Sequence, residues 1–211
     1  MDSLFEKITL YDFLGYAVPG CVCLLMFLAE WILTMPLETL EHLEAFGVGL
    51  GLTFLLLGYV LGVFLSQVSR SVFDPLADLW ELLCKKIRPE RAERNIVDEE
   101  TLKSALRKSG LVCGEIKGNV PDDYMTLMYG VVQVDPDYKR IHNYSSAACM
   151  YKNMAAALMA GGAFWYISGY WDKSWICLCF LIAVFYWVRW RRFEKKKNDY
   201  AMVWFIEKYN S

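Results

Sequence analysis

Hydrophobic residues gather along this chain into four stretches that are separated by polar and charged segments. The stretches cover residues 13–35, 46–68, 154–170 and 175–190. A helix that crosses a bilayer needs about 20 consecutive apolar residues. The first two stretches reach that length, whereas the last two are shorter and the fourth is the weakest. The pattern predicts an all-α integral membrane protein with four transmembrane helices in two hairpins and a helical cytoplasmic domain between them.

The alternative for the last two stretches is a hairpin buried inside a soluble protein. Aromatic residues cluster around the tight turn between these stretches, and Trp and Tyr are enriched where a helix meets the membrane surface. This clustering favours the transmembrane interpretation. The residues are Trp165, Tyr166, Tyr170, Trp171 and Trp175.

The stretches divide the chain into four expected segments. After the second stretch, apolar residues continue at helical spacing to about Ile87. A separate helix is expected to begin at the acidic residues that follow Asp98 and to end at Gly110. A long helix is expected to begin near Asp135 and to run into the third span. The segments are a lead-in and first hairpin at 1–68, a cytoplasmic helical domain at 69–152, a second hairpin at 153–190, and a basic C-terminal helix at 191–211.

Four glycines in the second span recur on one side of the helix. At about 100° per residue they project within roughly 60° of one another. Small residues let helix backbones approach closely in lipid, where packing replaces the hydrophobic driving force. A close helix–helix contact is therefore expected, either within one protomer or between protomers. The four are Gly47, Gly51, Gly58 and Gly62.

The first span contains Pro19, with Gly15 and Gly20 on either side. A proline inside a helix removes one main-chain hydrogen bond and clashes with the preceding turn, so a kink or break is one interpretation. Such a break persists in a membrane where protein or water satisfies the freed backbone groups. The alternative is that Pro19 lies in the first turns of the helix, where proline is tolerated.

The distribution of charge indicates the topology. Segment 69–152 carries 13 Lys/Arg and 13 Asp/Glu, and residues 189–211 carry seven basic residues against three acidic ones. The connection at 36–45 has no Lys or Arg. Because basic segments stay in the cytoplasm, both termini and the central domain are expected there, as in a multi-pass membrane protein. The acidic N-terminus favours a signal anchor over a cleaved signal peptide.

Composition adds few candidates for chemistry. Apolar residues make up 56% of the chain, above the roughly 45–50% of soluble domains. The seven cysteines form no CxxC pair, and His42 and His142 fall on opposite sides of the expected membrane, so no metal site is expected. No nucleophile or phosphate-loop motif occurs. We therefore expect no catalytic residues, no cofactor and no enzyme activity.

Glu30 is an ionisable residue in the outer part of the first span. Such a residue is costly in lipid and faces a bundle interior or a water-filled path by default, so a ring of Glu30 side chains would favour cations. The alternative is that Glu30 reaches water at the interface, because Met35-Pro36 follows soon after. Pro19, Ser66 and Gln67 are the other residues expected to line the path.

The central domain has two basic groups with tyrosines near the second. Basic groups with stacking aromatics suit a nucleotide or a single-stranded nucleic acid. The alternative is a solvated helix surface balanced by the acidic residues. The candidate ligand-binding residues are Lys85, Lys86, Arg88, Arg91, Lys139, Arg140, Tyr138 and Tyr144.

The sequence Asp12-Phe-Leu-Gly-Tyr-Ala-Val-Pro-Gly20, followed by Gly58-Tyr-Val-Leu-Gly62 and a helical domain between two hairpins, resembles four-span bacterial membrane effectors of antiphage systems. These include CBASS-like and Hailong-like effectors. The resemblance implies a multi-pass protein of the bacterial inner membrane that depolarises or permeabilises the cell under control of a nucleotidyltransferase product. It carries over no individual functional residue.

Together these features predict an oligomeric, ligand-gated ion channel or pore, with a tetramer favoured, surrounded by membrane lipid. The alternative is a membrane anchor or scaffold that recruits a soluble defence partner through 69–152. A small transporter is a weaker third interpretation, because one polar residue within the spans makes a poor substrate site.

Overall fold

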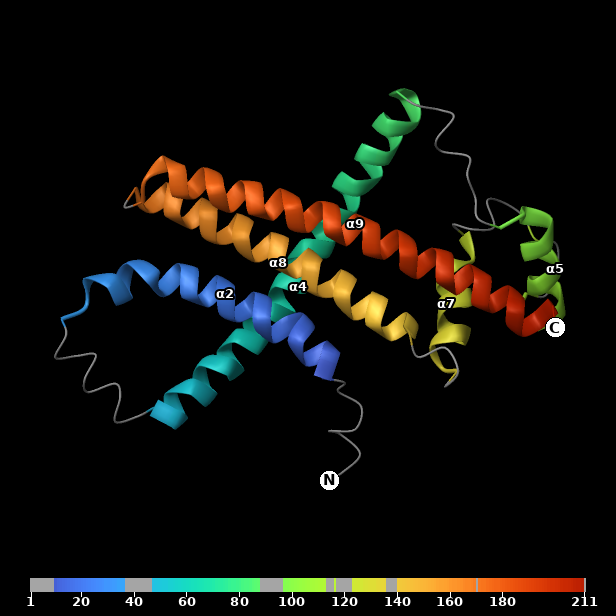
Figure 1. Cartoon of the computed structure of the whole chain (residues 1–211), viewed down its shortest axis with the longest axis horizontal. Helices are drawn as coiled ribbons and strands as arrows, with labels where there is room; N and C mark the ends of the chain where they lie inside the picture. The colour runs from blue at the N-terminus through green and yellow to red at the C-terminus, as the bar shows by residue number, and fades with distance from the viewer. Residues whose placement is uncertain are drawn as a thin grey trace. The chain divides into compact units, whose positions relative to one another are not determined.

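The computed structural model describes residues 10–36, 47–87, 97–112, 116, 123–135, 140–169 and 171–210. Within these residues the chain forms six α-helices and no strand, which confirms the all-α prediction (Figure 1). The helices are α2 (Leu10–Thr34), α4 (Gly47–Ile87), α5 (Glu99–Ser109), α7 (Met125–Gln133), α8 (Arg140–Ser168) and α9 (Lys173–Asn210).

Three of these helices are long and apolar enough to cross a membrane. The candidate spans are Phe13–Thr34 in α2, Gly47–Trp80 in α4 and Lys173–Asn210 in α9. Helix α8, which holds most of the expected third span, is not among the three. It is 29 residues long, but Lys152, Asn153 and several small residues lower its hydropathy. The chain is therefore a membrane protein by its helices, with three of the four expected spans supported by length and composition.

The chain separates into two compact units. The first, called here the apolar unit, comprises Met1–Asp78 and Ser146–Arg191. The second, the charged unit, comprises Leu79–Ser145 and Arg192–Ser211. Most of the chain's ionisable residues lie in the charged unit, which carries 16 Lys/Arg and 14 Asp/Glu.

In the apolar unit, α2 crosses α4 at a contact made by glycines. A Cβ atom at Gly20 would overlap the carbonyl oxygen of Gly58, and one at Gly62 would overlap the carbonyl oxygen of Tyr16. The two backbones therefore touch without intervening side chains, as expected for small residues in lipid. Figure 1 shows α4 passing obliquely across α2.

Helix α8 also packs against α2. The Met26 side chain occupies the space beside Gly161, and the rings of Phe27 and Phe164 meet edge to face at 5.1 Å. The indole Nε1 of Trp165 donates to the Met26 carbonyl oxygen at 2.8 Å. Aromatic and main-chain contacts thus hold α2 and α8 together along several turns.

Helices α8 and α9 form an antiparallel hairpin (Figure 1). Gly169 ends α8 with a φ of +68°, a left-handed conformation that suits glycine. The rings of Trp165 and Trp171 stack at 4.3 Å beside this turn, and Tyr151 and Tyr186 meet farther along the hairpin at 5.9 Å. The aromatic residues at the turn therefore pack on one another as well as facing outward.

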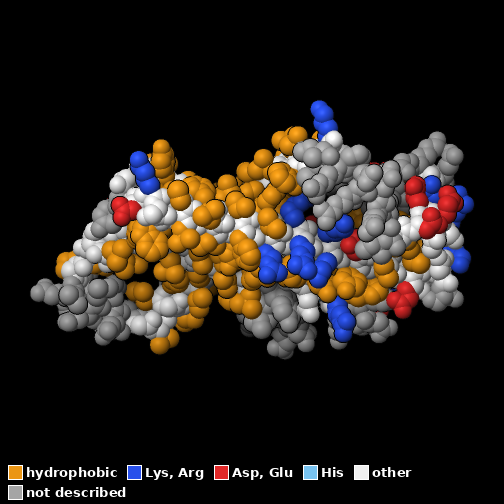
Figure 2. All heavy atoms as spheres, turned by 45° about the horizontal axis from the view of Figure 1, so that its top comes forward, with side chains coloured by type: hydrophobic (Ala, Val, Ile, Leu, Met, Phe, Trp, Pro, Cys, Tyr) orange, Lys and Arg blue, Asp and Glu red, His pale blue; other side chains and the backbone are white. Residues whose placement is uncertain are grey.

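Much of the apolar unit's hydrophobic surface is exposed. Only 17% of the most apolar window of α4 is buried, and Figure 2 shows hydrophobic side chains gathered in a continuous area of the visible face (Figure 2). Lipid or other membrane helices would cover such a continuous apolar surface. Examples in α4 are Leu52, Leu56, Leu57, Val60 and Phe64.

The charged unit has its own hydrophobic core. Leu106 of α5, Met128 of α7, Ile141 of α8 and Phe205 of α9 are fully buried together. The end of α9 is therefore a core element, although the sequence pattern presents it mainly as a basic helix.

Helix α5 begins and ends as the sequence predicts. The Asp98 carboxylate accepts the Thr101 N–H at 3.4 Å, and Gly110 ends the helix with a φ of +67°. Both are common ways of giving hydrogen-bond partners to the free N–H and C=O groups at the ends of a helix.

Candidate functional site where three helices meet

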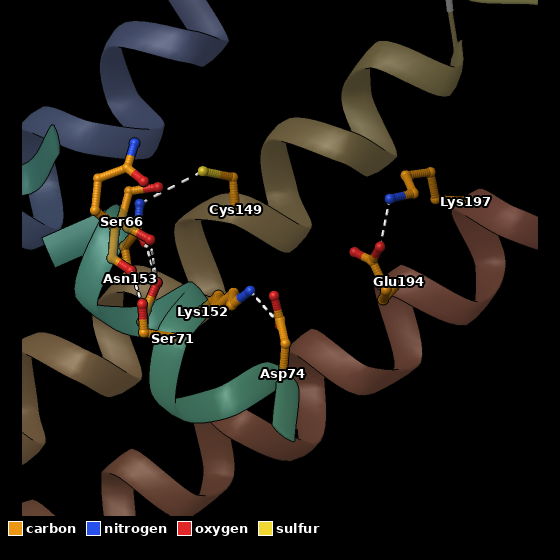
Figure 3. Close-up of polar contacts among 10 residues, drawn as sticks. Ser66, Ser71, Asp74, Cys149, Lys152, Asn153, Glu194 and Lys197 are labelled. Carbon is orange, nitrogen blue, oxygen red and sulfur yellow. Dashed lines mark hydrogen bonds and ion pairs between the residues drawn. The ribbon is translucent and has the colours of Figure 1, made fainter. Parts of the chain in front are cut away.

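Polar side chains are buried inside the apolar unit at the point where α2, α4 and α8 meet. Asn153 of α8 is fully buried, Ser69 of α4 is 1% exposed and Ser66 is 5% exposed. Figure 3 shows the Asn153 side chain and its dashed contact to Cys149 of the same helix. Polar groups removed from water need hydrogen-bond partners, because an unpaired buried polar group is costly.

Each polar end of Asn153 has a partner. Its Nδ2 donates to the Gly15 carbonyl oxygen of α2 at 3.2 Å and lies 3.4 Å from Cys149 Sγ. Its Oδ1 lies 3.1 Å from the Ser69 hydroxyl, which is also 2.9 Å from the Ser66 carbonyl oxygen. The single hydroxyl proton of Ser69 can serve only one of these two acceptors at a time.

The partner of Asn153 on α2 is a carbonyl that Pro19 leaves without its usual donor. In an α-helix the carbonyl of residue 15 accepts the N–H of residue 19, and proline has no N–H. Helix α2 nevertheless runs on through Pro19, which is buried. The expectation of a break and the alternative that Pro19 lies in the first turns are therefore both wrong: Pro19 is the tenth residue of a continuous helix, and a side chain from α8 satisfies the freed carbonyl.

An ion pair lies next to this cluster. Lys152 of α8 pairs with Asp74 of α4, and the Lys152 side chain is 12% exposed against 50% for Asp74 (Figure 3). The Lys152 Nζ also lies 4.8 Å from the centre of the Trp190 ring of α9. A lysine just before an expected span is typical of an interfacial anchor. The contacts of Lys152 instead join three helices.

The residues predicted to line an ion path are not brought together. Ser66 is buried beside Ser69, whereas its neighbour Gln67 is exposed. Glu30 is half-buried near the end of α2. It lies 15 residues beyond Gly15, about 22 Å along the helix. Glu30 is thus far from the Asn153 cluster within one chain.

The four predicted packing glycines divide into two pairs. Gly58 and Gly62 lie at the crossing with α2, where added side chains would overlap that helix. Gly47 and Gly51 have no atom of another part of the described chain within 4 Å of a Cβ position. The glycine pattern therefore extends beyond the contact that the structure shows.

Of the predicted ligand-binding residues, the structure describes the side chains of Lys86, Arg140 and Tyr144. Lys86 and Arg140 are exposed. Tyr144 stacks on Tyr200 at 5.0 Å and its ring also meets Phe193 at 6.1 Å, so one face of the ring is occupied. A hydrogen bond with Tyr200 raises the pKa of the Tyr144 phenol, and burial raises it further. The side chain of Lys85 and residues Arg88, Arg91, Tyr138 and Lys139 lie outside the described part of the chain.

Sequence reasoning missed Asn153, Ser69 and the Asp74 partner of Lys152. One signal could have found Asn153: a proline inside a span requires a donor for the carbonyl four residues earlier. The sequence did not say which helix supplies that donor. In the described residues no group of three His, Cys, Asp or Glu side chains could hold a metal ion.

Comparisons with protein-family models, with curated proteins and with solved structures find no match to this chain. At the meeting of α2, α4 and α8, hydrogen-bonding groups and an ion pair fix three helices. Among the described residues there, no nucleophile is paired with a base.

Proposed function

We propose that this chain is an oligomeric membrane effector that acts as a ligand-gated ion channel or pore. The observation that carries the proposal is the buried polar cluster of Ser66, Ser69 and Asn153 inside the apolar unit. Polar residues within membrane helices are costly and mark functional positions by default. In this proposal the chain is not an enzyme and needs no cofactor.

Helix α8 is proposed as the remaining span, which completes two hairpins. Its low hydropathy is compatible with this role because Asn153 is turned toward α2 and α4, and Lys152 is paired with Asp74. A helix covered by protein can carry polar residues that a lipid-facing helix cannot. The basic segments support a topology with both termini and the central domain in the cytoplasm, and the bacterial inner membrane is proposed from the resemblance of the N-terminal motif.

The ion path is proposed to form between protomers of a homo-oligomer, for which a tetramer is favoured. The largely exposed apolar surface of α4 supports both lipid and protomer contacts. Helix α2 would line the path, with Glu30 near one end. Exposed Gln67 is proposed nearer the other end, whereas Pro19 and Ser66, which are buried within the protomer, are proposed to support that end from behind.

The ligand is proposed to be a nucleotide or a single-stranded nucleic acid bound by the charged unit. Exposed Lys86 and Arg140 support an anionic ligand. The occupied face of Tyr144 reduces the room for stacking a base there. A ligand shifts a closed and open equilibrium only by its difference in affinity for the two states.

A role in antiphage defence is proposed from the resemblance of the N-terminal motif and span layout to effectors of such systems. The alternative function is a membrane anchor that recruits a soluble defence partner. The separate core of the charged unit favours that alternative, because it can present a binding surface without any ion path.

Reconstitution tests the two functions. Full-length protein is purified into liposomes of anionic and zwitterionic lipid, and ion flux is followed with a panel of nucleotides and oligonucleotides. The channel proposal expects flux above protein-free liposomes that changes with one ligand class. No flux under any ligand or voltage would exclude the channel. Retention of membrane potential in overexpressing cells would then favour the anchor.

A further inference from the structure

The main-chain carbonyl of Gly15 in the apolar unit has a side chain from another helix as its partner. Gly15 lacks the usual donor because Pro19 has no N–H, and Asn153 Nδ2 lies 3.2 Å from the Gly15 oxygen. A carbonyl oxygen only accepts hydrogen bonds, so the amide nitrogen of Asn153 must face it. Asn153 is fully buried, and among the described contacts it is the donor to this oxygen.

We propose that Asn153 is the positioning residue of α2, and that loss of its bond to Gly15 lets α2 bend at Pro19. This inference rests on the proposed channel function, in which α2 lines the ion path. Sharp helix bends occur at proline and where the main-chain ladder is interrupted. Both conditions meet at Gly15 once Asn153 is withdrawn.

The surroundings make this bond respond to water. In a dry helix contact a free carbonyl is costly, so the Asn153 bond is favoured. Where an open path admits water, water can replace Asn153 at the same oxygen. A side-chain hydrogen bond within a membrane protein changes an equilibrium constant by about threefold to twentyfold. The effect of this exchange on the equilibrium constant is thus large enough to favour one state over the other and small enough for the change to be reversible.

The Asn153 amide is held in this orientation by α4 and α8. The Ser69 hydroxyl lies 3.1 Å from Oδ1, and Cys149 Sγ lies 3.4 Å from Nδ2. Ser69 is itself almost fully buried. A shift of α4 against α8 would therefore loosen the amide and, through it, the Gly15 bond.

Carbonyl labelling gives a direct measurement of this bond. Glycine labelled with ¹³C at the carbonyl and tyrosine labelled with ¹⁵N select the pairs in which glycine precedes tyrosine. Solid-state NMR of the full-length chain in bilayers then observes few signals. They come from Gly15–Tyr16, Gly58–Tyr59 and Gly169–Tyr170.

Substitution at Asn153 and at Pro19 should have opposite effects on the Gly15 signal. Asn153→Leu removes the donor, and the Gly15 carbonyl signal should move upfield while the Gly169 signal stays. Adding Pro19→Ala restores an N–H four residues from Gly15, and the signal should return. Pro75→Ala is the matched control. Pro75 lies inside α4, and the carbonyl that lacks a helical donor because of it is that of Ser71, not that of Gly15. This control should not restore the signal.

Ion flux from the same samples links the bond to gating. Asn153→Leu should raise ligand-independent flux by about threefold to twentyfold, and Pro19→Ala should reverse the increase. A Gly15 signal that does not move in Asn153→Leu overturns the inference, whatever the flux. A moving signal with unchanged flux in a conducting protein overturns the link to bending.

Two further results separate the inference from the proposed function. If the Gly15 signal follows both substitutions but the unsubstituted protein never conducts, the channel proposal fails and the positioning role of Asn153 stands. If Asn153→Leu does not fold, Ser69→Ala replaces it, because it removes the support of Oδ1 and keeps Asn153. It should shift the Gly15 signal in the same direction by a smaller amount, and no shift overturns the inference.

Discussion

Gly20 of α2 and Gly58 of α4 lie so close together that neither position has room for a methyl group. A Cβ at Gly20 would overlap the Gly58 carbonyl oxygen, and a Cβ at Gly58 would overlap Cys21 Sγ. The contact places one helix backbone directly on another. In lipid this packing supplies attraction that the hydrophobic effect supplies in water.

Gly20→Ala should therefore destabilise the apolar unit. The overlap is with backbone, which cannot move aside as a side chain can, so the cost should be at least about 1–3 kcal/mol. Denaturation of the purified protein in detergent, followed by helicity, measures it. Gly51→Ala is the control because nothing lies within 4 Å of its Cβ position. Equal losses for Gly20→Ala and Gly51→Ala would contradict the observed crossing.

The ion pair of Lys152 and Asp74 should respond asymmetrically to substitution. Lys152 is mostly covered and Asp74 is half-exposed. Asp74→Asn leaves a covered ammonium without its counter-ion and should cost about 1–2 kcal/mol, reduced by the exposure of the pair. Lys152→Met leaves a carboxylate that water can reach and should cost less. The same detergent denaturation measures both variants.

The combined variant is the control for this asymmetry. Asp74→Asn with Lys152→Met removes both charges, so it should be more stable than Asp74→Asn alone. The cation–aromatic contact with Trp190 is lost in either Lys152 variant. A combined variant less stable than each single variant would show that the charges do not act as a pair.

The helices were predictable because local signals agreed with tertiary structure. Asp98 and Gly110 mark the ends of α5 through capping preferences that act within one turn. Apolar stretches marked α2, α4 and α9 because the length and composition of a helix indicate whether it can cross a membrane. These signals need no knowledge of neighbouring helices.

The candidate site was not predictable in the same way. Asn153 and Gly15 are 138 residues apart, and no local pattern states that one will satisfy the other. Pro19 is visible in the sequence, but the residue that donates to the freed Gly15 carbonyl depends on how α8 packs. Lys152 at a span boundary is typical of an interfacial anchor, and its pairing with Asp74 also arises only from packing. Hydropathy likewise leaves α8 out of the candidate spans, because it counts polar side chains without regard to what covers them.

Gly110 and Gly130 should respond differently to alanine in the charged unit. Gly110 has a φ of +67°, where a side chain costs about 1–2 kcal/mol. Gly130 lies inside α7 with nothing within 4 Å of its Cβ position, so alanine there should stabilise by up to about 1 kcal/mol. Thermal unfolding of the full chain gives the two shifts. Destabilisation by Gly130→Ala would show that its helix surface is covered.

Glu30→Gln tests the proposed ion path at its far end. A ring of carboxylates concentrates cations at a pore mouth, so neutralising Glu30 should lower the cation-to-anion permeability ratio in liposomes. Protein level and denaturation midpoint should stay unchanged, because Glu30 is only half-buried. Asp172→Asn is the matched control, since it removes the same charge from the turn expected on the same side of the membrane. An equal change in both variants would assign the effect to surface potential. No change in Glu30→Gln would remove Glu30 from the path and leave it as an interfacial residue.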